Sequence, residues 1–376
     1  MKNILFIMPS LPGGGAEKVL IDILKNLDIS KYRLTLLLEY KEDVYTSAIP
    51  SNVEVISLYC KSDIWTERLH RGLRILGLYH FFYSVIYRMA FLWLLKGREF
   101  DTIVSFMEGE AVRVHSYLFH KASKNVSWVH IDFKKKHWSL DFFRNKNHEK
   151  RCYSKMNEIV FVSEDARKSF LEIYPLDLNC CHVLYNLIDK KEIQRLSRAR
   201  DVEKKRFTIC MAGRLNRQKR YDRALEAIKL LKDDGYDIEL WILGGGELEI
   251  TLKTLAKNLG IEHMCDFKGF VRPAYSYMRI ADIFLNTSEA EGYPLVLCEA
   301  LCLGLPVVAT DITGANEILD KSKYVLLVPE NVWDIYRGLK AMIDDNLLRS
   351  DYAFKASQRS NMFSVERVVS QIDAVL

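Results

Sequence analysis

The 376-residue chain lacks several features that would assign it to a membrane or secreted class. It contains no run of 18 apolar residues that could cross a membrane, and its apolar start at residues 4–8 is too short for a secretory signal. It has no Cys-x2-Cys pair, and its eight cysteines are expected to be reduced thiols. These absences predict a cytoplasmic protein.

Positive charge is unevenly distributed along the chain. Residues 1–186 hold 26 Lys+Arg against 21 Asp+Glu, and the remainder holds 28 against 28, so the formal net charge of +5 lies entirely in the first half. A chain of this length predicts two domains of near-equal size. A basic surface attracts anionic lipid or nucleic acid. Since the excess of positive charge lies in the first half, only the first domain is expected to present such a surface.

The most informative stretch is residues 288–318, SEAEGYPLVLCEALCLGLPVVATDITGANEI. An apolar strand pattern at 283–287 runs into a polar loop, and leucines at helical spacing follow Pro294. Gly304 ends that helix, and residues 306–310 are typical of the next buried strand. The loop therefore lies at the strand edge where open α/β sheets bind ligands.

Two glutamates of this unit are candidates for binding sugars. Glu291 lies in the loop and Glu299 on the helix, with seven residues between them. A carboxylate accepts two hydrogen bonds in one plane, which matches a vicinal diol, so the pair suits a donor hexose and a nucleoside ribose. Glutamates on helices are common, so chance spacing is the alternative.

Two cations follow the strand expected at 207–213, which ends in Gly213. Arg214 and Lys219 precede the next helix, where two cations can bracket a diphosphate. Gly245 ends the following strand, where the lack of a side chain lets backbone approach a nucleotide closely. Scattered basic residues are normally exposed to solvent, which is the alternative for both cations.

The first half offers an anion-binding candidate and a histidine. A strand at 2–8 leads through Gly14 and Gly15 into a helix at 16–27, whose amides and dipole attract an anion. The glycines fit neither Gly-x-Gly-x-x-Gly nor a Walker loop, so a simple turn is the alternative. His130 closes a later strand, where a lone histidine is usually structural.

These strings together resemble a known enzyme family. The segment 288–318, the order Gly-Arg-Leu-x3-Lys at 213–219 and the string WVHID around His130 are similar to retaining glycosyltransferase family four, of the group 1 type found in bacterial surface-polysaccharide biosynthesis. The resemblance covers nearly the whole chain and is strongest at 207–319. The family usually has glycine where this chain has Arg220.

The resemblance implies the α/β fold called GT-B, in which two doubly wound parallel-sheet, Rossmann-like domains face each other across a cleft. We expect an acceptor-side domain at 1–186 and a donor-binding domain at 187–361. A terminal helix at 362–376 is expected to pack back on the first domain.

The resemblance also implies an activity, which is hexosyl transfer from a nucleoside diphosphate sugar to a hydroxyl of a glycan or lipid-linked glycan, with retained configuration. No metal or other cofactor is expected, because the chain has no Asp-x-Asp triplet and cationic side chains would replace a metal. The expected catalytic residues are His130, Arg214, Lys219 and Glu291, and the expected donor contacts are Gly14, Gly15, Gly213, Gly245, Glu291, Gly292, Tyr293, Pro294, Leu295 and Glu299.

Two segments of the first half combine basic and aromatic residues. Residues 64–96 predict a helix pair packed on the first sheet, with a face against lipid as the alternative. Residues 134–155 could bind single-stranded nucleic acid, but no nucleic-acid motif accompanies them. We therefore expect no nucleic-acid partner and favour a surface for a lipid-linked acceptor, peripheral at the inner face of an anionic membrane, over a merely solvated face.

Two other functions are compatible with the sequence. A nucleotide-sugar epimerase of the GT-B fold would share the cleft but would not need a basic, aromatic acceptor domain. A non-catalytic, basic membrane-binding protein would have no reason for the set Arg214, Lys219, Glu291 and Glu299. The donor base, the sugar and the acceptor depend on pocket shape, which spacing does not specify.

Overall fold

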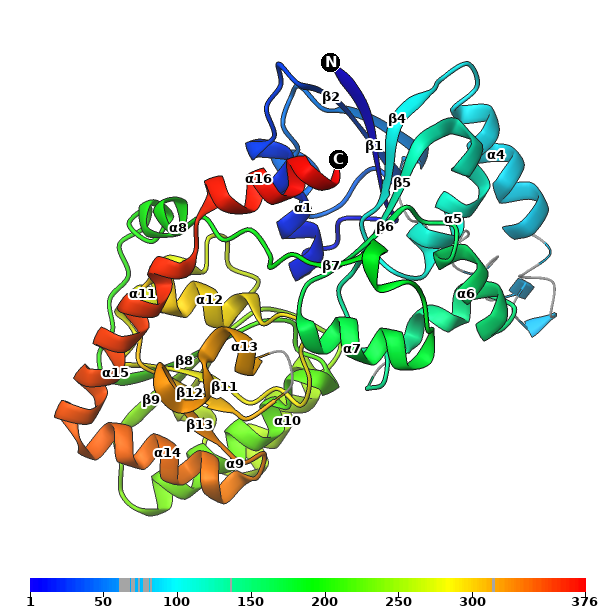
Figure 1. Ribbon diagram of the computed structural model, residues 1–376. Helices are drawn as coiled ribbons and strands as arrows, with labels where there is room; N and C mark the ends of the chain where they lie inside the picture. Colours follow the sequence, from blue (N-terminus) through cyan, green and yellow to red (C-terminus); the bar gives the residue numbers. More distant parts are fainter. Residues whose placement is uncertain are drawn as a thin grey trace. The chain divides into compact units, whose positions relative to one another are not determined.

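The computed structural model describes residues 1–60, 83–135, 137–312 and 315–376, with a few isolated positions between 68 and 81. These residues form two compact units, Met1–Leu187 with Val365–Leu376, and Ile188–Ser364. Each unit is a parallel sheet with helices packed on it (Figure 1). The predicted α/β class with two doubly wound sheets is confirmed.

The first unit is built on seven parallel strands, counted over the described residues, in the order β3-β2-β1-β4-β5-β6-β7. They are β1 (Lys2–Met8), β2 (Tyr32–Tyr40), β3 (Glu54–Tyr59), β4 (Phe100–Ser105), β5 (Ala122–Val129), β6 (Glu158–Phe161) and β7 (Cys181–Val183). In β1, Ile4 and Phe6 alternate with Leu5 and Ile7, and all four are buried. Since neighbouring side chains of a strand point to opposite faces, both faces of this sheet are covered.

Helices from both ends of the chain cover the first sheet. They are α1 (Gly15–Asn26), α4 (Arg88–Leu94), α5 (Glu110–Leu118), α6 (Lys146–Tyr153), α7 (Glu164–Ile173) and α16 (Val365–Val375). Leu5 and Ile7 pack with α4 and α5. The α16 helix lies beside α1 (Figure 1) and buries Ile372.

The two segments that combine basic and aromatic residues are described to different extents. The predicted helix pair at 64–96 lies largely outside the described residues. Apart from isolated positions, these include its end, which forms a π-helical turn (Tyr83–Tyr87) and α4. In the segment 134–155, Phe143 and Tyr153 are buried in a core cluster while most of the cations are exposed. None of the helices in the described ranges is long and apolar enough to cross a membrane.

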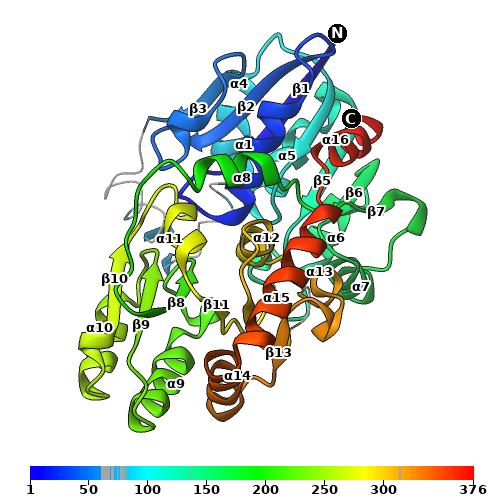
Figure 2. The same cartoon turned by 90° about the vertical axis from the view of Figure 1, so that its left-hand side faces the viewer.

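The second unit is built on six parallel strands, again over the described residues, in the order β10-β9-β8-β11-β12-β13. They are β8 (Phe207–Ala212), β9 (Ile238–Leu243), β10 (Cys265–Gly269), β11 (Ile283–Asn286), β12 (Val307–Thr310) and β13 (Leu326–Val328). Figure 2 shows β8 between β9 and β11. The carboxyl ends of these neighbouring strands therefore meet at one edge.

The helices of the second unit include one that the sequence did not reveal. They are α8 (Lys190–Leu196), α9 (Tyr221–Asp233), α10 (Glu249–Asn258), α11 (Tyr275–Ile280), α12 (Leu295–Cys302), α13 (Ala315–Leu319), α14 (Val332–Asp344) and α15 (Asn346–Arg359). This helix is α8, and Asp189 caps it by accepting from the Glu192 N–H at 2.9 Å. The predicted strand, loop, helix and strand at 283–310 is confirmed as β11, α12 and β12.

Candidate functional site

Glycines allow the loops after β8 and β9 to pack closely against each other at the carboxyl ends of these strands. Gly213 and Gly244 have φ of +146° and +139°, a region that L side chains avoid. A Cβ on Gly244 would lie 2.0 Å from the Gly213 carbonyl oxygen. The Leu215 N–H donates to the carbonyl of Gly245 at 2.9 Å. The predicted donor contacts Gly213 and Gly245 thus lie in one locked pair of loops.

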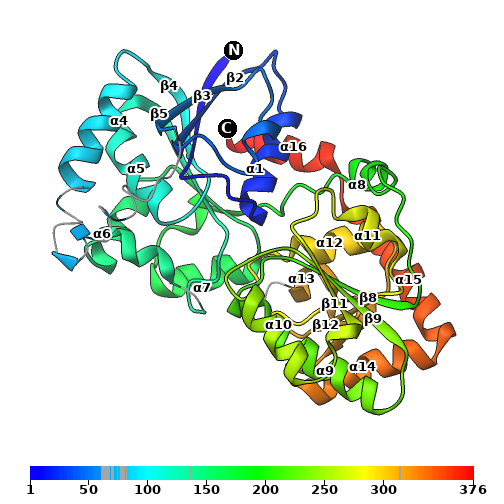
Figure 3. The ribbon, with the colours of Figure 1, turned by 180° about the vertical axis from the view of Figure 1, so that it is seen from behind.

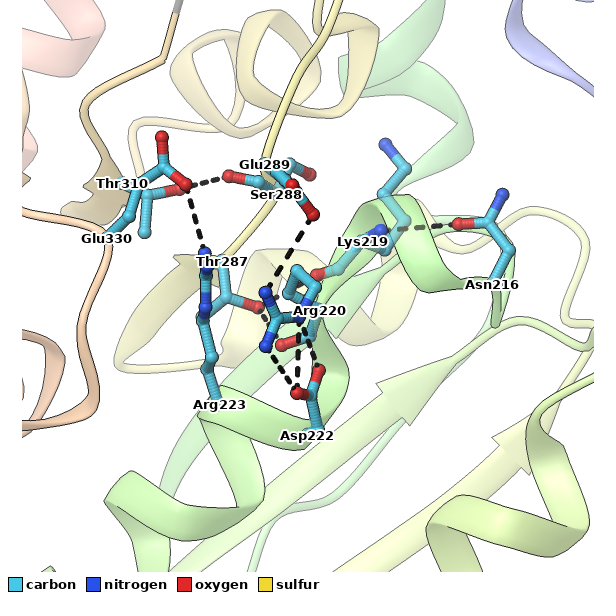
Figure 4. Close-up of polar contacts among 10 residues, drawn as sticks. All are labelled: Asn216, Lys219, Arg220, Asp222, Arg223, Thr287, Ser288, Glu289, Thr310 and Glu330. Atoms are coloured by element: carbon cyan, nitrogen blue, oxygen red, sulfur yellow. Dashed lines mark hydrogen bonds and ion pairs between the residues drawn. The ribbon is translucent and has the colours of Figure 1, made fainter. Parts of the chain in front are cut away.

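The loop after β8 contains a short 3-10 turn, Arg217–Lys219, that positions Lys219. Asn216 caps this turn by accepting from the Lys219 N–H at 3.2 Å (Figure 4). Arg220 follows with φ 48° and ψ 45°, the left-handed conformation that glycine adopts most easily. Its guanidinium pairs with Asp222 at 2.7 Å. The turn therefore forms although arginine replaces the family's glycine.

The loop after β11 is tied to this turn. The Thr287 hydroxyl, close to the carbonyls of both Lys219 and Arg220 at 2.9 Å, can donate to either (Figure 4). The Gln218 side chain donates to the carbonyl of Ala290 at 2.6 Å, and its own backbone carbonyl accepts from the Glu289 N–H at 2.9 Å. The two loops are held as one unit because each bond crosses from one to the other.

Glu291 completes the connection by an ion pair. Its Oε1 contacts the Lys219 ammonium, and the Ser288 hydroxyl donates to the same oxygen at 2.8 Å. The Lys219 and Glu291 side chains are only 18% and 11% exposed. A pair this shielded from water interacts more strongly than a surface pair. The structure thus brings together two of the predicted catalytic residues.

Arg214 and Glu299 have different surroundings. Arg214 is exposed, and it forms no ion pair within the described ranges. Glu299 is buried on α12, where its Oε1 accepts from the Tyr275 hydroxyl at 2.9 Å. Tyr275 belongs to α11 and was not among the residues predicted from the sequence. The two glutamates of the predicted pair are therefore held by separate partners, one cationic and one neutral.

Between these glutamates, the chain turns into α12. Gly292 is partly exposed, whereas Tyr293 and Leu295 are buried. Pro294 is the N-cap of α12 and directly precedes its first turn. The four predicted donor contacts thus lie directly at the N-terminus of α12.

The predicted anion site at the start of α1 contains a carboxylate. Gly14 is the N-cap of this helix. A Cβ placed on Gly14 would lie 2.2 Å from the Oε2 atom of Glu17, so the carboxylate turns back over the helix start. Gly15 begins the helix itself. A phosphate can reach these amides only if Glu17 rotates away, because the two anions would repel each other.

His130 follows β5 and is held in its neutral form. Its ring packs at 5.0 Å from the ring of Phe106 and hydrogen-bonds to the Phe106 carbonyl. Burial lowers the pKa of His130 to about 4. The Nε2 atom is buried and has no hydrogen-bond partner in the described part of the chain. A neutral imidazole has one nitrogen that donates and one that accepts, so Nε2 can offer a lone pair to a hydroxyl.

Glu108 lies beside the backbone of His130. Its carboxylate accepts from the His130 backbone N–H at 3.0 Å. Burial raises the pKa of Glu108 to about 7, and the negative charges of Glu149 and Glu17 add to the rise. Glu108 was not among the residues predicted from the sequence, because its importance depends on burial.

The family follows from the second unit. Residues 192–359 match the family described as glycosyl transferases group 1. This segment includes every strand of the second unit. The second unit is a group 1 glycosyltransferase domain.

Relatives and solved structures agree with this assignment. The chain is 32% identical over 218 residues to the Campylobacter jejuni N-acetylgalactosamine-N,N'-diacetylbacillosaminyl-diphospho-undecaprenol 4-alpha-N-acetylgalactosaminyltransferase, covering 57% of this chain and 59% of that protein. It is 26% identical over 228 residues to the Erwinia amylovora amylovoran biosynthesis glycosyltransferase AmsD, covering 60% and 63%. The chain thus spans less than two thirds of the length of these curated relatives.

The solved structure of Anabaena HepE in complex with UDP and glucose matches with a TM-score of 0.78 at 20% identity, covering 100% of this chain and 99% of that chain. At this identity the likeness concerns the fold, which is the predicted GT-B fold. Within the group 1 domain, Lys219 and Glu291 form one connected cluster with the loops after β8 and β11. Glu299 bonds instead to Tyr275, and His130 belongs to the other unit.

The raised pKa of Glu108 makes a testable contribution to stability. As pH rises from 4.5 towards 7, the unfolded chain loses the Glu108 proton before the folded chain does, so the free energy of unfolding falls. Glu108→Gln should remove roughly 3 kcal/mol of this fall. Urea unfolding at pH 4 and pH 8 measures the change in the free energy of unfolding between these pH values, and Glu42→Gln, at an exposed position, is the control. An unchanged pH dependence in Glu108→Gln would contradict the burial argument.

Proposed function

We propose that the chain is a retaining glycosyltransferase that moves a hexosyl unit from a nucleoside diphosphate sugar to a hydroxyl of a glycan or lipid-linked glycan. The observation that carries the proposal is the Lys219–Glu291 ion pair, a cation suited to phosphate beside a carboxylate suited to sugar hydroxyls. HepE was solved with UDP and glucose, and the name of the Campylobacter relative includes diphospho-undecaprenol; both are consistent with this proposal.

The donor would exchange partners with the ion pair. Before binding, Lys219 and Glu291 neutralise each other, so neither charge is left buried and unpaired. When the donor enters, Lys219 would turn to the diphosphate and Glu291 would accept from sugar hydroxyls. Arg214 would bind the diphosphate from the solvent side, and Glu299 would accept from the ribose.

His130 would contact the sugar and not the phosphate. Because the pKa of His130 is lowered to about 4, the ring is neutral near pH 7 and offers no cation to a phosphate. Its unpartnered Nε2 is an acceptor, and a sugar hydroxyl is the donor that fits it.

The transfer step would not need a protein base. The bond between the sugar C1 and the phosphate oxygen breaks, and the acceptor oxygen bonds to C1 on the same face, so the configuration is retained. The leaving phosphate takes the acceptor proton. Lys219 and Arg214 would stabilise the charge that develops on the phosphate, in the role that a metal has elsewhere. The protein would work at the cytoplasmic face of a membrane, which its basic first unit favours.

The two cations can be tested by binding. Lys219→Ala or Arg214→Ala should weaken the binding of a nucleoside diphosphate by roughly 1.5 to 3 kcal/mol, because each removes a charge-assisted hydrogen bond to phosphate. Calorimetric titration with UDP and GDP measures the decrease. Lys257→Ala, which removes an exposed lysine from α10, is the matched control. Equal affinity in all variants would place the diphosphate elsewhere.

The reaction itself can be tested by incubating the protein with radiolabelled nucleotide sugars, with and without membrane extract. We expect label in a glycan or lipid fraction, an α-linked product from an α-linked donor, and unchanged transfer in excess EDTA. Label that stays on the nucleotide with an altered sugar would indicate an epimerase. No conversion of any donor would leave a membrane-binding protein as the better hypothesis, and activity that only added metal restores would contradict the metal-free step.

A further inference from the structure

The first unit contains a cavity of about 520 Å³ that is separate from the residues assigned to the donor. It is lined by residues of α4, α5 and α6 and of the segments that flank α5 and α6. Figure 3 shows these three helices gathered on one side of the unit. Its size falls within the roughly 300–1,000 Å³ of small-molecule sites.

The lining of this cavity is cationic. It includes Arg88, Arg113, Arg144, Arg151 and Lys155, and it includes no aspartate or glutamate among the described residues. Except for Arg113, these cations are exposed and have no ion pair with any described residue. Like charges that line one cavity repel one another. A bound anion would remove this repulsion.

Arg113 forms the rigid part of the cavity. It is 2% exposed, and its Nε donates to the Tyr117 hydroxyl at 2.8 Å. Its Nη1 lies 2.6 and 2.9 Å from the two ring nitrogens of His148. The acidic residue next to His148 on α6, Glu149, is bonded instead to His137, Ser139 and Tyr174. The guanidinium is thereby fixed by two side chains, Tyr117 and His148, that also line the cavity.

An exposed apolar stripe adjoins Arg88. Ile86, Met89 and Trp93 are spaced by three and four residues and are 50%, 66% and 75% exposed. This spacing places them on one helical face. Large apolar residues exposed together usually mark a binding surface. A cationic cavity next to an apolar stripe fits a ligand that has a phosphate group at one end and hydrocarbon at the other.

We propose that this cavity binds the diphosphate of a lipid-linked acceptor, with the lipid chain along Ile86, Met89 and Trp93. The inference rests on the proposed function for the identity of the ligand, but the diphosphate site itself does not. Arginines bind phosphate oxygens in pairs of parallel hydrogen bonds, and a diphosphate offers enough oxygens for several of them.

The test uses inorganic pyrophosphate and the full chain carrying Lys219→Ala, which weakens the donor site. Arg144→Gln with Arg151→Gln should reduce pyrophosphate affinity about a hundredfold, which is about tenfold for each arginine replaced. Lys146→Gln with Lys150→Gln removes the same charge from the same region without touching the cavity lining and should have little effect. Equal reductions in both double variants would mean that pyrophosphate responds only to the total charge of the region, and would overturn the site.

Vesicles identify the source of the diphosphate. Neutral vesicles that contain a polyprenyl diphosphate should retain the protein, and the Arg144→Gln, Arg151→Gln variant should lose this retention. Equal retention on vesicles that carry the same total charge on anionic phospholipid, without polyprenyl diphosphate, would overturn the lipid-linked assignment. UDP affinity should be unchanged in that variant. If the wild type binds no nucleotide while pyrophosphate still depends on both arginines, the proposed function fails but the site stands.

Discussion

The ion pair between Lys219 and Glu291 is the interaction on which the proposed donor site depends. It joins the loops after β8 and β11, which are also tied by Thr287 and Gln218. Because both charges are largely shielded from water, removal of either one would leave the other poorly solvated. The pair therefore keeps a cation and a carboxylate close together in the absence of a ligand, and a sugar diphosphate can satisfy both.

The first unit holds its ionisable side chains in two different environments. At the edge formed by β4 and β5, Glu108 is buried and His130 is kept neutral. On α4 to α6, by contrast, cations line a cavity. The excess positive charge of the first half is thus not spread evenly, and the edge that holds His130 offers an acceptor for hydroxyls while the cavity offers donors for phosphates.

The sequence predicted the repeated strand and helix elements well, because they depend on local periodicity. The strands predicted at 2–8 and 207–213 and the unit from β11 to β12 are where the apolar spacing places them. The α8 helix was missed, because its seven residues are mostly charged or polar and its amphipathic pattern is too short to recognise. The position of Glu291 beside Lys219 is consistent with the predicted site, but their direct pairing could not be predicted, since it joins loops 72 residues apart.

Other features depend on tertiary contacts that could not be predicted from a single sequence. The left-handed conformation of Arg220 contradicts the ordinary preference for glycine and is compensated by Asp222 and by neighbours from the next loop. Similarly, the rotation of Glu17 over the α1 start is visible only in the folded chain. The cavity of Arg88, Arg113 and Arg144 draws on residues far apart in the chain, each of which looks like a solvated cation when considered alone.

The most direct test of the central claim compares a nucleoside diphosphate with its sugar-bearing form in the wild type and in Glu291→Gln. If Glu291 binds the sugar and Lys219 the diphosphate, the variant should lose affinity for the nucleotide sugar by about tenfold. Its affinity for the nucleoside diphosphate should stay equal or rise, because Lys219 is released from its partner. An equal decrease for both ligands, or no change for either, would contradict the division of roles within the ion pair.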